Sequence, residues 1–431
     1  MTSRRGALPQ GSLAQALQPV VDSVVPGGLP VSIRFWDGSI IGPPSSSALV
    51  VRSPAALRRL LWAPNELGLG RAYVSGELDI EGDVFDALAV RDAIEHRGPS
   101  LSLGVGGWRQ LLGAAWSLGL LAPPLPRPPE EARLHGRRHT KERDKGAITY
   151  HYDISDDFYR LVLGETMAYS CALFKSPDLS LDDAQHEKHD LVCRKLGLQP
   201  GMRLLDVGCG WGGMLLHAVA HYGVRGVGVT ISDAQASFAA KRIADSGLGD
   251  RAEIRLCDYR DVVDGPYDAI CSIGMFEHVG LARLGEYFAR LFSLLTPTGR
   301  LLNHGISRPG RSGGFSRHSF IDRYVFPDGE LHEVGSVVSA IQRAGFEVRD
   351  VESLREHYTR TLRCWVENLQ NNWQAGTELV GPARARVWRL YMAASALNFE
   401  AGRTSIHQVL AVKPDARGRS AMPPTRAGFV S

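Results

Sequence analysis

A short glycine-rich turn near the middle of the chain constrains its fold more than any other segment. The apolar run at residues 204–207 (LLDV) ends at residues 208–213 (GCGWGG), and a helix-like stretch follows from Met214. This order is typical of a buried parallel strand, a tight turn and the N-terminus of a helix. Such a turn lets a ligand contact bare backbone and the positive end of the helix dipole. Because a G-x-G pattern alone is weak, the neighbouring sequence must identify the ligand.

Length and composition set broad limits on the protein class. The chain has 431 residues, enough for two or three domains, and its net charge of +3 is too small to indicate a nucleic acid partner. Its six cysteines include no C-x-x-C pair, so we expect reduced thiols in a cytoplasmic protein and assign no metal-binding residue. The first ten residues are polar and show no secretory signal.

Residues 1–122 are predicted to form a small α+β domain. A strand-like run at residues 29–36 leads into Asp37-Gly38, a strong turn signal, and a second strand is expected at residues 48–52. Ser53-Pro54 then predicts the start of a helix. This region contains no cluster of acids, bases or metal ligands, so we expect the chemistry elsewhere.

A linker is predicted at residues 123–146, and its charge has two interpretations. A solvated linker is the ordinary one, while a patch that contacts anionic lipid headgroups is the alternative. The preceding apolar stretch, residues 111–122, is shorter than the roughly 20 residues that span a bilayer. A buried helix or an interfacial helix therefore fits it. The basic residues of the linker are Arg127, Arg133, Arg137, Arg138, Lys141, Arg143 and Lys145.

From residue 147 to 413, strand and helix patterns alternate. This predicts an α/β domain with a doubly wound, Rossmann-like, mostly parallel sheet and helices on both faces. The tail at residues 414–431 is rich in Pro, Arg, Gly and Ser and is expected to be disordered. The seven predicted strands are residues 203–207, 226–230, 252–256, 267–273, 300–304, 346–352 and 406–413, the last two as an antiparallel edge pair.

The glycine turn resembles the first motif of class I S-adenosylmethionine-dependent methyltransferases. The G-x-G-x-x-G spacing of dinucleotide sites is only loosely met, through Gly213. By the resemblance, Asp258 at the end of the third strand bonds the adenine amino group. The second strand ends in Thr230 where an acid commonly takes the ribose hydroxyls, so we expect Asp233 to cap the next helix and Gln235 to reach the ribose. The turn residues assigned to the cofactor are Asp206, Gly208, Cys209 and Gly210.

Further motifs indicate a narrower family. Residues 151–174 (HYDISDDFYRLVLGETMAYSCALF) strongly resemble the start of the catalytic domain of cyclopropane-fatty-acyl-phospholipid synthases and the related mycolic acid cyclopropane synthases. The resemblance extends over residues 147–412 and, more faintly, to residues 67–76. Its other motifs follow in order at residues 204–213, 272–280, 303–306, 320–329 and 357–358.

The resemblance implies methyl transfer from S-adenosylmethionine to a cis double bond in an unsaturated phospholipid acyl chain. Placement of the double bond against the methyl does most of the catalytic work. The product is a carbocation, which aromatic faces stabilise. In this family a bound bicarbonate is the base that removes the final proton. The aromatic candidates here are Tyr169, Phe174, Phe276 and Tyr324.

Carried over by motif, the bicarbonate holders are Cys171, Glu277, His304 and Tyr358, with backbone from Gly274 and Ile306. Each side chain alone has an ordinary structural explanation, but all four fall on family positions. A cysteine often given a catalytic role in the family corresponds to Ser395 here, which argues against a thiolate nucleophile. The resemblance also places Tyr169, Ser170, Gly208, Thr230, Ile231, Gln235 and Tyr259 around the cofactor.

Several outcomes stay open at this stage. The cation gives a cyclopropane by ring closure or a methylene branch by hydride shift, and a methylene product implies a partner reductase. The layout around Phe35 and Trp36 slightly favours the methylene-forming, tuberculostearate-type relatives. We expect a peripheral protein at the inner face of the membrane and consider a homodimer. The alternatives are a generic small-molecule methyltransferase and an inactive lipid-binding protein, against which the intact Glu277, His304 and Tyr358 argue.

Overall fold

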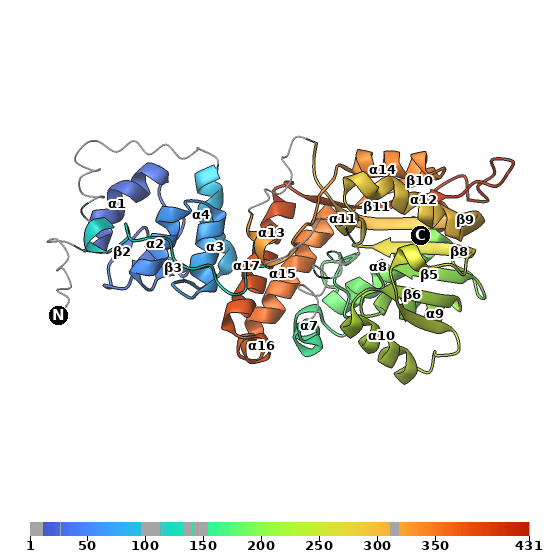
Figure 1. Cartoon of the computed structure of the whole chain (residues 1–431), viewed down its shortest axis with the longest axis horizontal. Coiled ribbons are helices and arrows are strands. Elements are labelled where there is room, and N and C mark those ends of the chain that lie inside the picture. The colour runs from blue at the N-terminus through green and yellow to red at the C-terminus, as the bar shows by residue number, and fades with distance from the viewer. Residues whose placement is uncertain are drawn as a thin grey trace. The chain divides into compact units, whose positions relative to one another are not determined.

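The computed structural model describes residues 12–25, 27–95, 113, 115–132, 140, 143, 146, 154–310 and 319–430. The chain forms two compact units (Figure 1). The smaller unit contains residues 1–131, 318–324 and 381–394, and the larger contains residues 132–317, 325–380 and 395–431. The predicted basic residues Arg133, Arg137, Arg138, Lys141 and Lys145 lie outside the described residues, as do residues 151–153 and much of the apolar stretch before Ala115.

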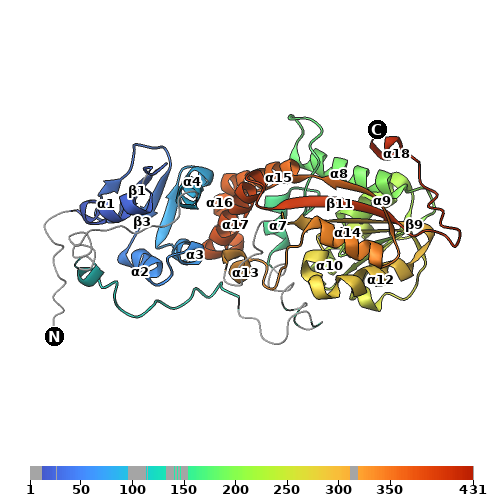
Figure 2. The ribbon, with the colours of Figure 1, turned by 90° about the horizontal axis from the view of Figure 1, so that it is seen from above.

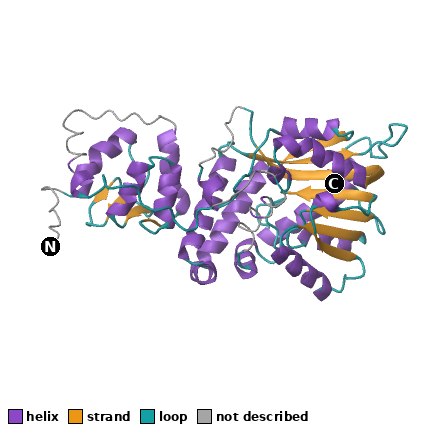
Figure 3. Cartoon of the chain, in the orientation of Figure 1, coloured by secondary structure: helices purple, strands orange, loops and turns teal. Residues whose placement is uncertain are grey.

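A seven-stranded sheet forms the centre of the larger unit, as predicted (Figure 3). Its order is β10-β11-β9-β8-β5-β6-β7; β5 through β9 pair in parallel, and β11 is antiparallel to both β9 and β10. The expected antiparallel edge pair is therefore confirmed. The strands are β5 (Arg203–Val207), β6 (Arg225–Thr230), β7 (Ala252–Leu256), β8 (Tyr267–Ile273), β9 (Leu295–Ser307), β10 (Glu347–Ser353) and β11 (Ser405–Val412).

Alternate residues of the central strands face opposite layers of helices. Leu204 lies in a buried cluster with side chains of α8 and α9, whereas Leu205 lies in the cluster with α12 and α14. This period-two alternation explains why the strands read as continuous apolar runs. The helices are α7 (Asp156–Leu163), α8 (Leu181–Leu196), α9 (Gly213–Tyr222), α10 (Asp233–Asp245), α11 (Phe276–Val279), α12 (Leu284–Leu294), α14 (Val334–Arg343), α15 (Arg355–Asn371), α16 (Trp373–Val380), α17 (Pro382–Glu400) and α18 (Ala427–Val430).

The smaller unit is an α+β structure with a four-stranded sheet in the order β2-β1-β3-β4. The Asp37-Gly38 turn joins β1 to β2 as an antiparallel pair, and Gly38 has a φ of +84°, which favours glycine. Ser53 precedes α2, with Pro54 as its first residue. The elements are α1 (Leu13–Val24), β1 (Ser32–Phe35), β2 (Ile40–Ile41), β3 (Ala48–Val51), α2 (Pro54–Trp62), α3 (Glu66–Val74), β4 (Leu78–Glu81), α4 (Val84–Glu95) and α13 (Phe320–Tyr324).

The boundaries of the smaller unit differ from the predicted end at residue 122. The unit continues to Glu131, whose carboxylate accepts two hydrogen bonds of 2.8 Å from Arg71. Two later segments also belong to it: α13, whose Phe320 lies against Gly70, and the first part of α17, whose Arg389 donates to the Tyr73 hydroxyl at 3.4 Å. These long-range contacts are invisible to composition, which suggested a contiguous domain.

The C-terminal tail, expected to be disordered, is described through residue 430 and is anchored near its end, although most of its side chains are exposed. Phe429 on α18 is only 4% exposed, and its carbonyl accepts a hydrogen bond from Arg194 on α8 at 3.3 Å. Arg426 forms an ion pair with Asp350. A single aromatic anchor and an ion pair therefore fix a segment whose composition predicted no structure. Among the described residues, no helix has the length and apolar character needed to cross a membrane.

Candidate active site

The glycine turn after β5 has the geometry that its sequence predicted. Gly208, Gly210 and Gly212 all have positive φ angles, of +75°, +54° and +80°, which only glycine adopts readily. The amides of Gly208 and Cys209 both donate to the carbonyl of Val229 on β6, at 2.9 and 3.0 Å. These bonds fix the turn to the sheet, and α9 begins directly after it at Gly213.

One cavity lies along this turn at the carboxyl ends of the parallel strands. Its lining comes from the ends of β5, β6, β7 and β8 and from the segment before α8. This is where doubly wound folds bind ligands. The structure thus brings together every residue assigned to the cofactor: Tyr169, Ser170, Asp206, Gly208, Cys209, Gly210, Thr230, Ile231, Gln235, Asp258 and Tyr259.

The end of β6 replaces the usual acid with a polar pair. The Thr230 hydroxyl donates to Oε1 of Gln235 at 2.9 Å, and both side chains are buried in the cavity wall. The N-cap of α10 is Ser232, whose hydroxyl accepts the Gln235 amide at 3.3 Å. The expectation that Asp233 caps this helix is therefore wrong, because Asp233 is already its first helical residue.

Asp258 at the end of β7 lies in the cavity wall beside Arg260. Its carboxylate accepts hydrogen bonds from the Arg260 guanidinium at 2.7 and 2.6 Å and from the Arg260 amide at 2.9 Å. These bonds orient the carboxylate. Arg260 also lines the cavity. A ligand group that donates a hydrogen bond to Asp258 would therefore lie next to the Asp258–Arg260 ion pair.

A buried charged group that the sequence analysis missed lies on the opposite wall. Lys188 of α8 is 1% exposed, and its Nζ donates to Oγ of Ser170 at 2.9 Å. Burial lowers the pKa of Lys188 to about 8 and raises the pKa of Asp206 to about 6. Asp206 Oδ1 accepts the Cys271 thiol, while its buried Oδ2 has no partner among the described residues.

This arrangement fits S-adenosylmethionine. Added Cβ atoms would collide with Met275 at Gly208 but meet no protein atom within 4 Å at Gly210, so the turn presents bare backbone to the cavity. The unsatisfied Asp206 oxygen and the strand-end polar groups are acceptors for a cationic, hydroxyl-bearing ligand. The bound cofactor supplies an electrophilic methyl on sulfur.

Of the predicted anion holders, Gly274 and Glu277 follow β8, and His304 and Ile306 lie on β9, the next strand of the sheet. The Gly274 amide, at the cavity wall, donates to the His304 carbonyl at 2.8 Å, and Glu277 Oε1 accepts the Ile306 amide at 2.7 Å. Both amides are therefore engaged in fixing the cluster. Glu277 Oε2 and His304 Nε2 are buried without a hydrogen-bond partner among the described residues.

Burial sets the protonation of this cluster. It raises the pKa of Glu277 to about 7 and lowers the pKa of His304 well below its usual range, with Lys188 and Lys195 adding repulsion at His304. His304 Nδ1 lies 3.1 Å from Nε2 of Gln408. The site therefore offers a neutral imidazole on β9 and, bonded to Ile306 of the same strand, a carboxyl that is half ionised near neutral pH.

Cys171 and Tyr358 meet at the start of α15. The Cys171 thiol lies 3.6 Å from the Leu354 carbonyl, which also accepts the Tyr358 amide at 3.1 Å. Burial raises the pKa of Cys171 far above its usual range, so this side chain stays a thiol and is no nucleophile. Ser395 is buried within α17.

The four aromatic candidates for stabilising a cation are not equivalent. Tyr169 lines the cavity and stacks near Trp365, with ring centroids 5.3 Å apart. Phe276 packs in the sheet core, and the Phe174 ring already faces the Arg360 guanidinium at 4.0 Å. Tyr324 belongs to the smaller unit, where it stacks on Phe320.

Together, the doubly wound sheet and the cavity at its glycine turn define a class I S-adenosylmethionine-dependent methyltransferase. The chain belongs to the mycolic acid cyclopropane synthetase family, whose model matches residues 139–409. The family resemblance seen in the sequence is thereby confirmed, as is a methyltransferase activity that depends on S-adenosylmethionine.

Relatives cover this chain to different extents. A probable fatty acid methyltransferase of Mycobacterium tuberculosis is 43% identical over 412 residues, covering 92% of this chain and 94% of the relative. The tuberculostearic acid methyltransferase UfaA1 of the same species is 32% identical, and the match covers 93% of this chain and 92% of the relative. The solved structure of mycolic acid cyclopropane synthase CmaA1 with SAH and CTAB matches with a TM-score of 0.59 and 36% identity, covering 62% of this chain and 98% of that one.

Proposed function

We propose that this enzyme transfers a methyl group from S-adenosylmethionine to the cis double bond of an unsaturated phospholipid acyl chain. The observation that carries the proposal is the buried Glu277 carboxyl, which follows Gly274 of the cavity wall along the chain and whose Oε2 has no hydrogen-bond partner among the described residues. Methyl transfer to an oxygen or nitrogen can release its proton to water, whereas a carbocation held in an apolar pocket needs a base inside the protein. A buried carboxyl with an unsatisfied oxygen fits that need.

The chemistry balances without an additional reagent. The π electrons of the double bond form a bond to the methyl carbon as the carbon–sulfur bond breaks, which leaves a cation on the neighbouring carbon. Loss of a proton from the transferred methyl closes a cyclopropane. A hydride shift followed by proton loss gives a methylene branch instead. In both routes one proton leaves and the chain gains one CH2.

We propose that bicarbonate binds between Glu277, His304, Cys171 and Tyr358 and supplies the base. The two buried unsatisfied atoms, Glu277 Oε2 and His304 Nε2, support an added hydrogen-bonding group. The raised pKa of Glu277 lets its carboxyl lie beside an anion in protonated form. Activity that falls in bicarbonate-depleted buffer and returns on its addition would support this assignment; unchanged activity would instead make Glu277 the base.

We infer a methylene product, with a partner reductase converting the methylene to a methyl branch. The support is the coverage of the relatives: the tuberculostearic acid methyltransferase aligns with 93% of this chain, whereas the cyclopropane synthase structure covers 62%. The smaller unit of this chain thus has a counterpart in the former. A homodimer is also part of the proposal, and light scattering of the purified protein tests it.

We propose that the smaller unit contacts the inner face of the membrane from the cytoplasm. Four of its large apolar side chains are exposed: Trp116 at 78%, Trp62 at 52%, Leu61 at 47% and Leu121 at 46%. The Trp62 indole donates to the Ala122 carbonyl at 3.0 Å, so the two tryptophans lie on neighbouring segments. Exposed tryptophan and leucine are typical of surfaces that insert into a lipid interface.

The decisive experiment is expression in a bacterium that makes oleoyl phospholipids, with Glu277→Gln and empty vector as controls. Mass spectrometry of the fatty acids should show a gain of one CH2 only with the unaltered protein. NMR then distinguishes ring protons from methylene protons. Lack of any mass shift, with the protein folded and binding S-adenosylhomocysteine, would overturn the lipid substrate and favour a small-molecule methyltransferase.

A further inference from the structure

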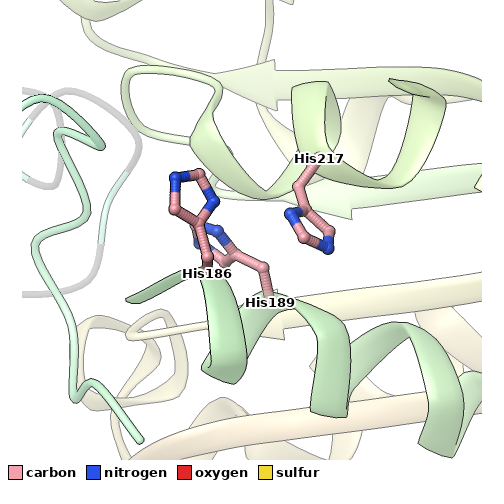
Figure 4. Close-up of side chains that lie close together, drawn as sticks. All are labelled: His186, His189 and His217. Carbon is pink, nitrogen blue, oxygen red and sulfur yellow. The ribbon is translucent and has the colours of Figure 1, made fainter. Parts of the chain in front are cut away.

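Three histidines outside the sets assigned to the cofactor and the anion converge between two helices of the larger unit. His186 and His189 lie three residues apart on α8, and His217 lies on α9. Figure 4 shows the three rings between the two helices, and Figure 2 shows the two helices side by side. One ring nitrogen from each histidine lies within 4.8 Å of the other two.

His217 lacks the partners that a structural histidine normally has. Both of its ring nitrogens are buried, and neither has a hydrogen-bond partner among the described residues. Buried polar atoms in proteins are nearly always paired, so two unpaired nitrogens on one ring indicate a missing ligand.

We propose that His186, His189 and His217 form a binding site for a zinc-class divalent cation that fastens α8 to α9. Three imidazoles with no thiolate or carboxylate in the set suit Zn²⁺ and its neighbours Co²⁺, Ni²⁺ and Cu²⁺ rather than Mg²⁺ or Ca²⁺. At a Zn–N distance of about 2.0 Å, ligand nitrogens lie about 3.3 Å apart, so modest ring rotations close the set.

The position of the site allows both access and an effect on the cofactor cavity. His186 is exposed, which gives the ion an entry path and leaves room for water as a fourth ligand. His189 is buried, lines the cofactor cavity and packs against Gly213, the first residue of α9. The ion therefore fixes the helix that begins at the glycine turn, and this role does not depend on which substrate the enzyme methylates.

Titration of the full-length, tag-free, chelator-treated protein with Zn²⁺ tests the site. We expect one ion per chain, a higher melting temperature with zinc, and visible d–d bands of a nitrogen-coordinated ion when Co²⁺ is added instead. His186→Gln and His217→Gln should each weaken zinc binding at least about tenfold. His186 is exposed, so its variant keeps the fold even if the His217 variant does not.

A neighbouring histidine provides the control. The His221 ring lies with its centroid 4.5 Å from that of His217, yet His221 is outside the three-nitrogen set. His221→Gln should therefore bind zinc as the unaltered protein does. Absence of stoichiometric zinc binding, or equal binding by all variants, would overturn the proposal and leave a histidine packing cluster. A loss in His221→Gln as large as in His217→Gln would overturn the ligand assignment.

Discussion

Oε1 of Glu277 accepts the Ile306 amide at 2.7 Å, while Oε2 of the same carboxyl is buried and has no hydrogen-bond partner among the described residues. The bond fixes the carboxyl to β9, in the strand segment that also carries His304. One oxygen therefore positions the group, and the other is left for chemistry. This division of roles is what a positioned proton acceptor or a holder of a small anion requires.

Glu277→Gln should abolish most product formation without affecting cofactor binding. The amide keeps the size and can still accept the Ile306 amide, but it cannot exchange a proton. We expect a fall of roughly 10²- to 10⁴-fold in turnover, measured with unsaturated phospholipid vesicles. Glu286→Gln, an identical change on an exposed side chain of α12, should be silent. Full activity in Glu277→Gln would remove this residue from the mechanism.

The pKa of Glu277 also predicts a pH-dependent stability. Burial raises that pKa from 4.5 to about 7 in the folded protein. Between these values the unfolded chain has released the proton and the folded chain still holds it, so rising pH favours unfolding. The unaltered protein should therefore lose roughly 3 kcal/mol relative to Glu277→Gln between pH 4.5 and 7. Urea unfolding at pH 5 and pH 8 measures this, and an equal difference at both values would contradict it.

Substitution of the turn glycines should separate strain from ligand contact. In Gly208→Ala the new Cβ would lie 2.4 Å from Met275 Cγ at a φ of +75°, which should cost roughly 2 to 4 kcal/mol. In Gly210→Ala no protein atom lies within 4 Å, so only the backbone cost of about 1 kcal/mol applies. Both variants should bind S-adenosylhomocysteine more weakly by calorimetry. Equal stability of Gly208→Ala and Gly210→Ala would show that the Met275 side chain moves away from the new Cβ at little cost in free energy.

The sheet and the cofactor site could be predicted because their signals are local. Each strand is a short apolar run, and the turn is a contiguous motif whose glycines have the positive φ angles that their spacing suggested. Parallel strands then bring distant strand ends such as Thr230 and Asp258 to one edge. The hydrophobic pattern of the strands and the glycines of the turn are enough to predict these features.

Other features depend on long-range packing and are only weakly indicated by the sequence pattern. Lys188 lies on a polar helix and reads as exposed, yet α8 buries it together with Gln185. The H-x-x-H spacing of His186 and His189 was a visible signal, but its partner on α9 could only be found in three dimensions. The tail was misjudged because a single buried Phe429 outweighs a composition typical of disorder.

Removal of the exposed tryptophans should weaken membrane binding. Trp116→Ser removes apolar surface that is already in contact with water, so the melting temperature should change little, whereas Trp62→Ser also removes the hydrogen bond to Ala122 and should lower it modestly. Sedimentation with anionic phospholipid vesicles should show reduced binding, most strongly in the double variant. Val263, 85% exposed on the larger unit, provides the control, and Val263→Ser should bind as before. Unchanged binding by the double variant would exclude this surface.

Lys188→Met should lower both cofactor affinity and stability. Methionine fills the same volume, and its thioether removes a buried ammonium whose pKa burial has already lowered to about 8. Loss of the ammonium releases Ser170 and leaves Asp206 without its nearby positive charge, so S-adenosylhomocysteine should bind more weakly in calorimetry.

Lys195→Met offers a matched control, because Lys195 is equally buried at 1% exposure but ion-pairs with Asp350 and Glu352 instead of facing the cavity. Its removal also leaves a buried carboxylate short of charge, which typically costs 3 to 5 kcal/mol, so both variants should lose stability and only Lys188→Met should lose affinity. Cofactor affinity of the folded Lys195→Met protein should be unchanged. If both variants lost stability and kept affinity, Lys188 would have only a structural role. Ser170 and Asp206 would then bind the cofactor without its help.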